Sequence, residues 1–163
     1  MKEKGAIMMF SYRLVRLIET HADTLAEGLE KRVMASSSLP CFRTIPAHEL
    51  RERVYEIYRH LGDWLLGKNQ GDIEERYREI GARRAAQKVP LAEVILAIVL
   101  TKENLWDFLQ SEAVVDRAVE MMGELELLKI LEQFFDRAIY FAAVGYQAEL
   151  GRLRRQEREV VAG

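Results

Sequence analysis

Apolar residues recur every three to four positions along most of the chain, which is the spacing of helices that bury one face. Residues 8–35 follow this spacing, and a connector with Pro40 and Pro46 separates them from a second apolar stripe over residues 46–67. Residues 72–88 carry a narrow stripe among charged positions, so we expect this third helix on the outside of the domain. No alternating strand pattern and no internal repeat occurs in the sequence.

Residues 91–100 differ from the other helical segments because they are apolar on nearly every side. A helix of this kind is normally enclosed by other helices, and we expect it to occupy residues 90–110 in the centre of a bundle. Proline is tolerated in the first turn of a helix, whereas the residue before it is biased away from helical geometry. The third and fourth helices should therefore meet at a corner formed by Lys88 and Val89.

A last periodic segment begins after Ser111 and continues to about Glu159. A helix from Gly123 to Glu159 has a length of about 55 Å at 1.5 Å per residue, whereas a compact domain of this size has a radius of gyration of about 15 Å. The helix must therefore project from the domain or bend, with Gly145 and Gly151 as weak points.

Together these segments predict an all-α protein, a bundle of five to six helices packed in a globin-like way, with a long C-terminal helix. We assign residues 1–150 to one helical domain and residues 151–163 to a helical connector or tail. The second part has few apolar residues to bury against the first.

Composition and charge narrow the class of protein further. The chain of 163 residues has 49% hydrophobic and 31% charged residues, which is typical of a single folded domain. The formal net charge of −2 provides no general attraction to nucleic acid or to an anionic membrane. The apolar run at 89–100 is shorter than the roughly 20 residues that span a bilayer. We therefore expect a soluble, cytoplasmic protein without nucleic-acid or membrane partners.

Two histidines, His21 and His60, lie at helical spacing from apolar residues and are the candidates for a cofactor-binding role. Such positions suit a haem or metal ligand, but they suit a hydrogen-bonded structural histidine more often. No histidine follows His60, so a later helix cannot supply the proximal ligand of a globin. We expect no cofactor and no bound metal, with haem as the alternative.

No arrangement of residues in the sequence predicts catalysis. Neighbouring carboxylates such as Glu74 and Glu75 point in different directions on a helix, and the Glu-x-x-His pairs of a di-iron site are lacking. Cys41, the only cysteine, lies in a connector and is either a redox-sensing thiol or an ordinary packed residue. Basic residues cluster at 83–84 and at 152–155. Glutamates near the second cluster favour a salt-bridged helix surface over a phosphate site there. We expect a protein that is not an enzyme.

The segment GARRAAQKVPLAEVI resembles the signature of the RsbRD-type N-terminal domain, in which a Gly-x-x-Arg-Ala-x-Gln-Gly-Val-Pro-Leu pattern precedes an apolar helix. The connector LPCFRTIP is also similar, and the resemblance covers about residues 12–110. Lys88 stands where the family pattern has glycine, which readily closes a helix with positive φ, so this corner is expected to use a different turn. The matching residues are Gly81, Arg84, Ala85, Gln87, Val89, Pro90, Leu91, Glu93, Val94 and Ile95.

This resemblance implies a sensory or regulatory module that stands ahead of an output domain, such as a STAS or kinase domain, in bacterial signalling proteins. Relatives in stressosomes look like globins without haem and pair through helices. On this basis residues 1–150 are sensor-like, and we expect a homodimer that relays packing changes through its C-terminal helix to protein partners or an output domain. A globin-like sensor that binds haem or a small apolar ligand is the alternative. The candidate pairing residues are Leu128, Phe135, Ile139, Ala142 and Tyr146.

Overall fold

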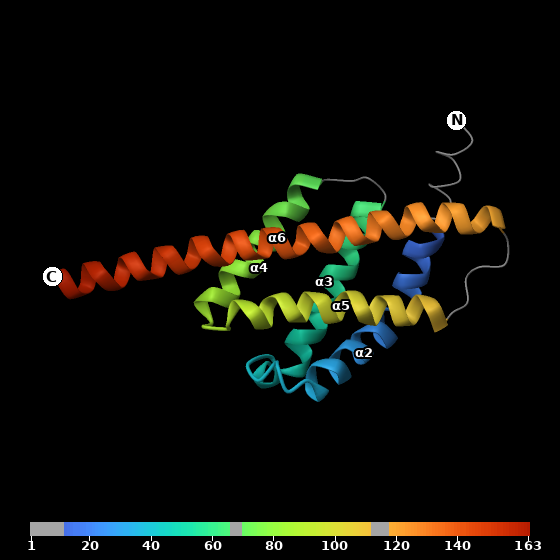
Figure 1. Cartoon of the computed structure of the whole chain (residues 1–163). Coiled ribbons are helices and arrows are strands. Elements are labelled where there is room, and N and C mark those ends of the chain that lie inside the picture. The colour runs from blue at the N-terminus through green and yellow to red at the C-terminus, as the bar shows by residue number, and fades with distance from the viewer. Residues whose placement is uncertain (1–11, 66–69, 112–117) are drawn as a thin grey trace.

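The computed structural model describes residues 12–65, 70–111 and 118–163, and all regular structure in these ranges is helical (Figure 1). The expected all-α bundle with a long C-terminal helix is therefore confirmed. The helical elements in chain order are residues 12–20, α2 (Ala22–Ala35), the 3₁₀ helix η1 (Phe42–Thr44), α3 (Ala47–Leu65), α4 (Gln70–Ala86), α5 (Leu91–Ser111) and α6 (Ala118–Ala162).

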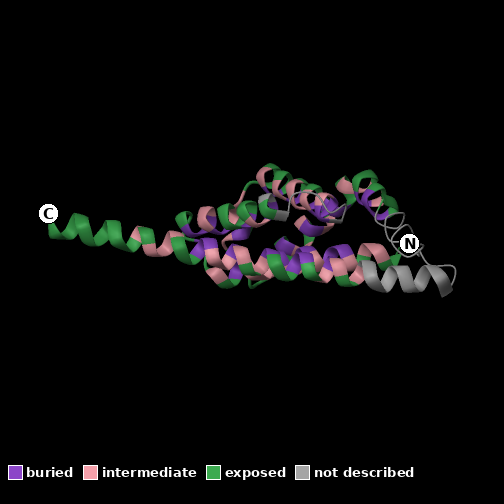
Figure 2. Cartoon of the chain, turned by 90° about the horizontal axis from the view of Figure 1, so that it is seen from above, coloured by how far each residue is buried: buried purple, intermediate pink, exposed green. Residues whose placement is uncertain are grey.

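Helices α5 and α6 lie side by side in antiparallel directions, and α3 crosses behind them (Figure 1). Two contacts fix the register of this pair. Midway along α5, Lys102 Nζ lies 3.2 Å from Glu132 Oε2. Just before the start of α5, the carbonyl of Val89 accepts a hydrogen bond of 2.7 Å from the Tyr146 hydroxyl. The core lies between the helix layers, where buried positions face one another (Figure 2).

Helix α6 passes through the core and then leaves it. Leu131, Phe134 and Phe135 are each 1% exposed, whereas all residues of the range 154–163 are exposed. This end projects beyond the rest of the domain, and Figure 2 shows it as exposed along its whole length. The sequence left bending and projection as alternatives, and projection is the one that occurs.

Two glycines allow α4 and α6 to approach each other more closely than any other residue type would permit. A β-carbon at Gly81 would lie 1.9 Å from the carbonyl oxygen of Ala142, and one at Gly145 would lie 2.0 Å from the carbonyl oxygen of Arg78. These distances are far below van der Waals contact, so any side chain would force the backbones apart. Gly145 is therefore a contact point between helices rather than a site of bending.

Helix α4 ends in the corner that precedes Pro90. Lys88 has φ 59°, which is the left-handed conformation. Its N–H donates to the carbonyl of Ala85, and the N–H of Val89 donates to the carbonyl of Arg84, each at 3.0 Å. This pair of bonds defines a Schellman cap, which usually has glycine at the left-handed position. The expectation that lysine would impose a different turn is wrong, because Lys88 itself adopts the left-handed conformation and completes the glycine-type cap, and Val89 after it is buried.

The predicted single helix over residues 8–35 is interrupted, and residues 8–11 lie outside the described part of the chain. His21 forms a turn between the segment 12–20 and α2, with φ −109° and ψ 20°. Its ring Nδ1 donates at 2.9 Å to the carbonyl of Leu17, which also accepts the backbone N–H of His21. A side chain that competes for a helical carbonyl bends the helix, which explains the interruption.

Helix α5 is only partly enclosed within one chain, so the prediction of complete enclosure is wrong for the single chain. Val94, Ile98 and Leu105 are buried in the core, whereas Ile95 and Val99 on the adjoining face are half-buried. The reason is that, in the described ranges, no other helix lies in front of the α5 and α6 pair (Figure 1).

Lys88→Gly is expected to raise the free energy of unfolding by about 0.5–1 kcal/mol, because glycine adopts the left-handed conformation without steric cost. Urea denaturation followed by circular dichroism measures the change. Ala86→Gly is the control, since glycine at the last residue of α4 should lower stability by about 0.5–1 kcal/mol. A loss of stability in both variants would contradict the left-handed corner.

Gly145→Ala is expected to lower the free energy of unfolding by about 1–3 kcal/mol, the usual range for overpacking, because the new methyl group separates α4 from α6. Gly151→Ala is the matched control in the same helix. A β-carbon at Gly151 meets no atom within 4 Å, and alanine is the better helix former. Thermal unfolding distinguishes the variants, and equal stabilities would exclude a close contact at Gly145.

Candidate functional site

A small cavity between α2, α3, α4 and α5 is the main candidate for a functional site. Its volume is about 60 Å³. Aliphatic side chains form most of its wall, including Val33, Val54, Val94 and Ile98, and the ring of Phe42 in η1 adds to it. A mostly apolar hollow with a few polar groups is the usual form of a small-molecule site, although most such sites are larger.

Arg84 brings a positive charge to the wall of this cavity. The residue is 4% exposed, and its Nη1 donates to the amide oxygen of Gln87 at 2.8 Å. Its guanidinium carbon lies 5.1 Å from the centre of the Phe42 ring, which is a cation–π distance. Burial lowers the pKa of Arg84, and the charge of Arg53 lowers it further. Arginine nevertheless stays protonated in proteins, so the group is a buried cation.

Arg53 of α3 is the second charged residue of the wall. Its Nη1 lies 3.2 Å from Glu56 Oε2, whereas its Nε is buried without a hydrogen-bond partner. Among the residues that the structure describes, no carboxylate forms an ion pair with Arg84. The cavity therefore combines an apolar interior with two cations, of which one has a carboxylate partner.

Glu93, in the first turn of α5, is a buried acid that fastens the connector between α2 and α3. Its Oε2 accepts a hydrogen bond of 3.0 Å from the backbone N–H of Cys41. Burial raises the pKa of the Cys41 thiol, and the hydrogen bond to Glu93 raises it further. A protonated thiol is a poor nucleophile, so the structure favours the packed residue over the redox-sensing thiol.

Asn104 joins three helices in the core, seven residues after Ala97 on the same face of α5. Its Nδ2 donates to the carbonyl of Leu25 at 2.8 Å and to the hydroxyl of Tyr58 at 3.4 Å. A β-carbon at Gly28 would lie 2.6 Å from Asn104 Oδ1, so this glycine makes room for the amide. Burial raises the pKa of Tyr58 to about 12. The Tyr58 hydroxyl and the Asn104 amide are therefore neutral and hydrogen-bonded to each other, which suits a structural role.

His21 and His60, the weak cofactor candidates, contact different parts of the domain. The ring of His21 lies 5.2 Å from the ring of Phe108, and its Nδ1 is bonded to the backbone. His60 is half-buried in α3, its Nδ1 has no partner, and burial together with the charge of Arg76 lowers its pKa. Neither histidine lines the cavity. In the described ranges, no three His, Cys, Asp or Glu side chains gather into a potential metal site.

The candidate pairing residues of α6 face mainly into their own bundle. Phe135 and Ala142 are 1% and 0% exposed, and Tyr146 is 9% exposed and bonded within the chain. Leu128 and Ile139 are half-buried and pack against the core. The assignment of Phe135, Ala142 and Tyr146 to a homodimer surface is therefore wrong. The same spacing describes a helix packed against a partner and a helix packed against its own domain.

Arg84, Arg53 and Glu93 were not among the candidate site residues predicted from the sequence. Arg84 lies four residues after Ile80 and seven after Tyr77, on the apolar stripe of α4, and this register is the signal that identifies it as buried. Glu93 carries no such signal, because acidic residues are common in the first turn of exposed helices.

The salt-bridged helix surface expected near residues 152–155 is confirmed for one pair of residues. Arg152 Nε donates a hydrogen bond of 2.9 Å to Glu149 Oε2.

The all-helical bundle, its small apolar cavity and its projecting last helix are features of a helical signalling domain. The chain matches the family model of the RsbT co-antagonist protein rsbRD N-terminal domain over residues 23–161, and it belongs to this family. The family consists of signalling and regulatory domains of the stressosome type. The match includes α6, which the resemblance over residues 12–110 did not. No curated protein and no solved structure matches the chain.

A separate observation concerns membranes. Among the helices that the structure describes, none has the length and apolar content needed to cross a bilayer.

Glu93→Gln is expected to lower the pKa of the Cys41 thiol, because it removes a negative charge that favours the protonated form. The measurement is the rate of alkylation by iodoacetamide against pH, and Cys41 is the only cysteine, so the signal is unambiguous. The midpoint of this profile should shift to lower pH, whereas a change in access would alter the plateau rate at high pH. Glu49→Gln is the control, and equal midpoints in all three proteins would contradict the contact.

Proposed function

We propose that this domain is a non-enzymatic regulatory module that forms a homodimer and relays changes in bundle packing through α6. The observation that supports the proposal is the course of α6, which is both a core helix and a projecting one. Phe134 is buried in the core, and the same helix continues without interruption to Ala162, which is exposed. A displacement of α6 in the core would therefore move its far end, where a partner or an output domain can be attached.

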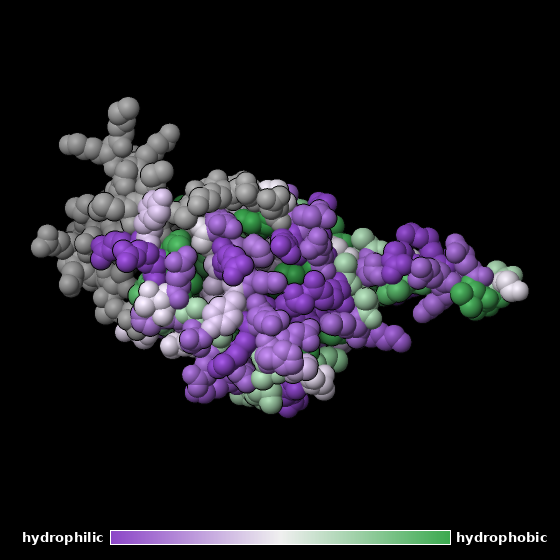
Figure 3. Space-filling view, turned by 180° about the vertical axis from the view of Figure 1, so that it is seen from behind, coloured by the Kyte–Doolittle hydropathy of each residue, from purple (hydrophilic) through white to green (hydrophobic). Residues whose placement is uncertain are grey.

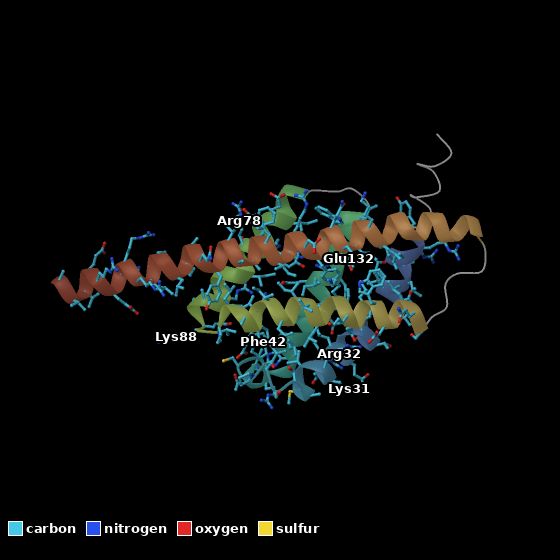
Figure 4. All side chains as sticks on the ribbon, in the orientation of Figure 1. Lys31, Arg32, Phe42, Arg78, Lys88 and Glu132 are labelled. Atoms are coloured by element: carbon cyan, nitrogen blue, oxygen red, sulfur yellow. The ribbon has the colours of Figure 1, made fainter. Side chains whose placement is uncertain are left out.

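The contacts of α6 couple it to two other helices. Gly81 and Gly145 hold it against the backbone of α4. On the other side, Glu132 accepts hydrogen bonds from Trp106 Nε1 at 3.1 Å and from Lys102 Nζ at 3.2 Å, both on α5 (Figure 4). Closely packed helices shift as units rather than deform continuously. A change in either neighbouring helix would therefore displace α6 as a whole.

The surface that we assign to the homodimer is the open side of the α5 and α6 pair, which we call the α5–α6 face. It consists of half-buried aliphatic residues on both helices, and an incompletely covered apolar helix is typical of a partner surface. The opposite side of the domain is mostly hydrophilic where its residues are described (Figure 3). The residues of the α5–α6 face are Ile95, Leu96, Val99, Ile139 and Ala143.

The cavity favours a small-ligand sensor over a haem sensor as the second candidate function. Ligand pockets usually have volumes of roughly 300–1,000 Å³, and haem needs a site in this range. The cavity has a volume of about 60 Å³ and is lined by neither His21 nor His60. A ligand that acts as the signal would therefore be a small one.

Val99→Arg is expected to convert a dimer into a monomer, because it places a charge on the apolar α5–α6 face. Sedimentation equilibrium measures the mass, and circular dichroism checks that the helices are retained. Met34→Arg is the matched control, since Met34 is an exposed apolar residue about 200° around α2 from Arg32, which pairs with α5. A monomeric wild type, or a dimeric Val99→Arg variant, would exclude this interface.

A further inference from the structure

We infer that the cavity between α2, α3, α4 and α5 binds a short-chain monocarboxylate, with the carboxylate paired to Arg84 and the alkyl chain in the apolar space. The residues that would do this are those already described at the cavity wall. Binding is a property of this cavity alone, and only its use as a signal rests on the proposed function.

The first argument is the charge of Arg84. The residue is 4% exposed, its Nη1 donates to the neutral amide of Gln87, and its guanidinium lies over the ring of Phe42. Arg53 and Arg83 act on it as like charges, and Glu49 acts as an opposite charge without forming an ion pair with it. A buried cation is costly unless it is paired with an anion. An anionic ligand would therefore bind here more strongly than a neutral one.

The second argument is the unused hydrogen-bond donor of Arg53. Its Nε is buried without a partner, although its Nη1 is paired with Glu56. A carboxylate has two oxygens and can accept bonds from two guanidinium groups at once. Thr101, the other polar residue of the wall, already donates to the carbonyl of Ala97 at 2.8 Å, so it is not a competing donor. The polar side of the site is therefore formed by two arginines.

The third argument is the size and polarity of the remaining space. The rest of the wall is mainly aliphatic, so the ligand must present an apolar part as well as a charge. At about 10–15 Å³ for each water-sized group, a volume of about 60 Å³ has room for roughly four to six heavy atoms. Acetate, propionate and butyrate fall in this range. Chloride would satisfy the charge but leave the apolar wall without contacts. Phosphate, which is largely a dianion at neutral pH, would exceed the single net positive charge that Arg84 and Arg53 leave once Glu56 is counted.

The test is a titration of the full chain with sodium propionate, followed by the methyl resonances of isotopically labelled valine and isoleucine. Sodium chloride replaces propionate at each point so that the ionic strength is constant. The methyl groups of Val94 and Ile98 should shift saturably, with a dissociation constant of about 0.1–1 mM for a ligand of so few atoms. Propionamide, which has the same shape without the charge, should bind at least tenfold more weakly.

Two substitutions of neighbouring arginines test whether binding depends on the charge at the cavity wall. Arg84→Gln should weaken propionate binding at least tenfold, whereas Arg83→Gln should leave it unchanged. Arg83 is a suitable control because its Nη1 is also buried without a partner, but the residue does not line the cavity. If Arg84→Gln does not fold, Ala97→Leu takes its place, because a larger side chain at this wall position should block propionate without altering any charge.

Four results would each overturn the proposed site. Propionamide could bind as tightly as propionate, or chloride could produce the same shifts. The Arg84→Gln variant could bind propionate like the wild type, or the shifts could fail to saturate by 50 mM propionate. Failure of the proposed function gives a different result. If propionate binds as expected but the protein is a monomer by sedimentation, the site stands and the homodimer does not.

Discussion

The close contact between the backbones of α4 and α6 is the constraint on which the rest of the domain depends. It exists because Gly81 faces the backbone of Ala142 and Gly145 faces the backbone of Arg78. This contact sets the distance between α6 and α4. At this distance the Tyr146 hydroxyl of α6 reaches the carbonyl of Val89, which follows α4. The start of α5 is thereby held against α6, and the position of α5 in turn defines one wall of the cavity.

The short segment that resembles the family signature has a physical role at almost every matching position. Gly81 permits the helix contact, Arg84 and Gln87 are bonded to each other beside the cavity, and Val89 is buried at the corner. Pro90 precedes the first turn of α5, and Glu93 holds the connector through the backbone of Cys41. One segment therefore organises α4, α5, α6 and the connector, which explains why so few residues were enough to suggest the family.

Periodicity predicted the helices well because each one buries a stripe of its own residues. Helix α5 begins at Leu91 and ends at Ser111, within one residue of the expected bounds, and α6 continues as far as expected. What spacing could not predict is which neighbour a stripe packs against. Phe135 and Ala142 were assigned to a second chain and are buried in their own. Glycine is ambiguous for a related reason, because the same residue permits a bend or a close contact, and Gly145 provides the contact.

The site was less predictable than the fold, because its chemistry comes from side chains that only the tertiary structure brings together. Arg53 lies on α3, Arg84 on α4 and Phe42 in η1, and no motif in the sequence links the three. The histidines, which are easier to recognise, lie elsewhere. The register of Arg84 on the apolar stripe of α4 indicates burial, but arginine is usually exposed unless it is paired, so the register competes with the ordinary preference of the residue type.

The central claim is that α6 is one rigid helix, fixed to α4 in the core and continuous to its projecting end. The most direct test is a distance measurement by pulsed electron paramagnetic resonance between spin labels at Glu79 on α4 and Gln156 on α6. Both positions are exposed, and Cys41 is replaced by alanine so that only the two introduced cysteines are labelled. Spin-diluted protein restricts the signal to pairs within one chain. The account predicts a single narrow distance distribution, and a broad or bimodal distribution would contradict it.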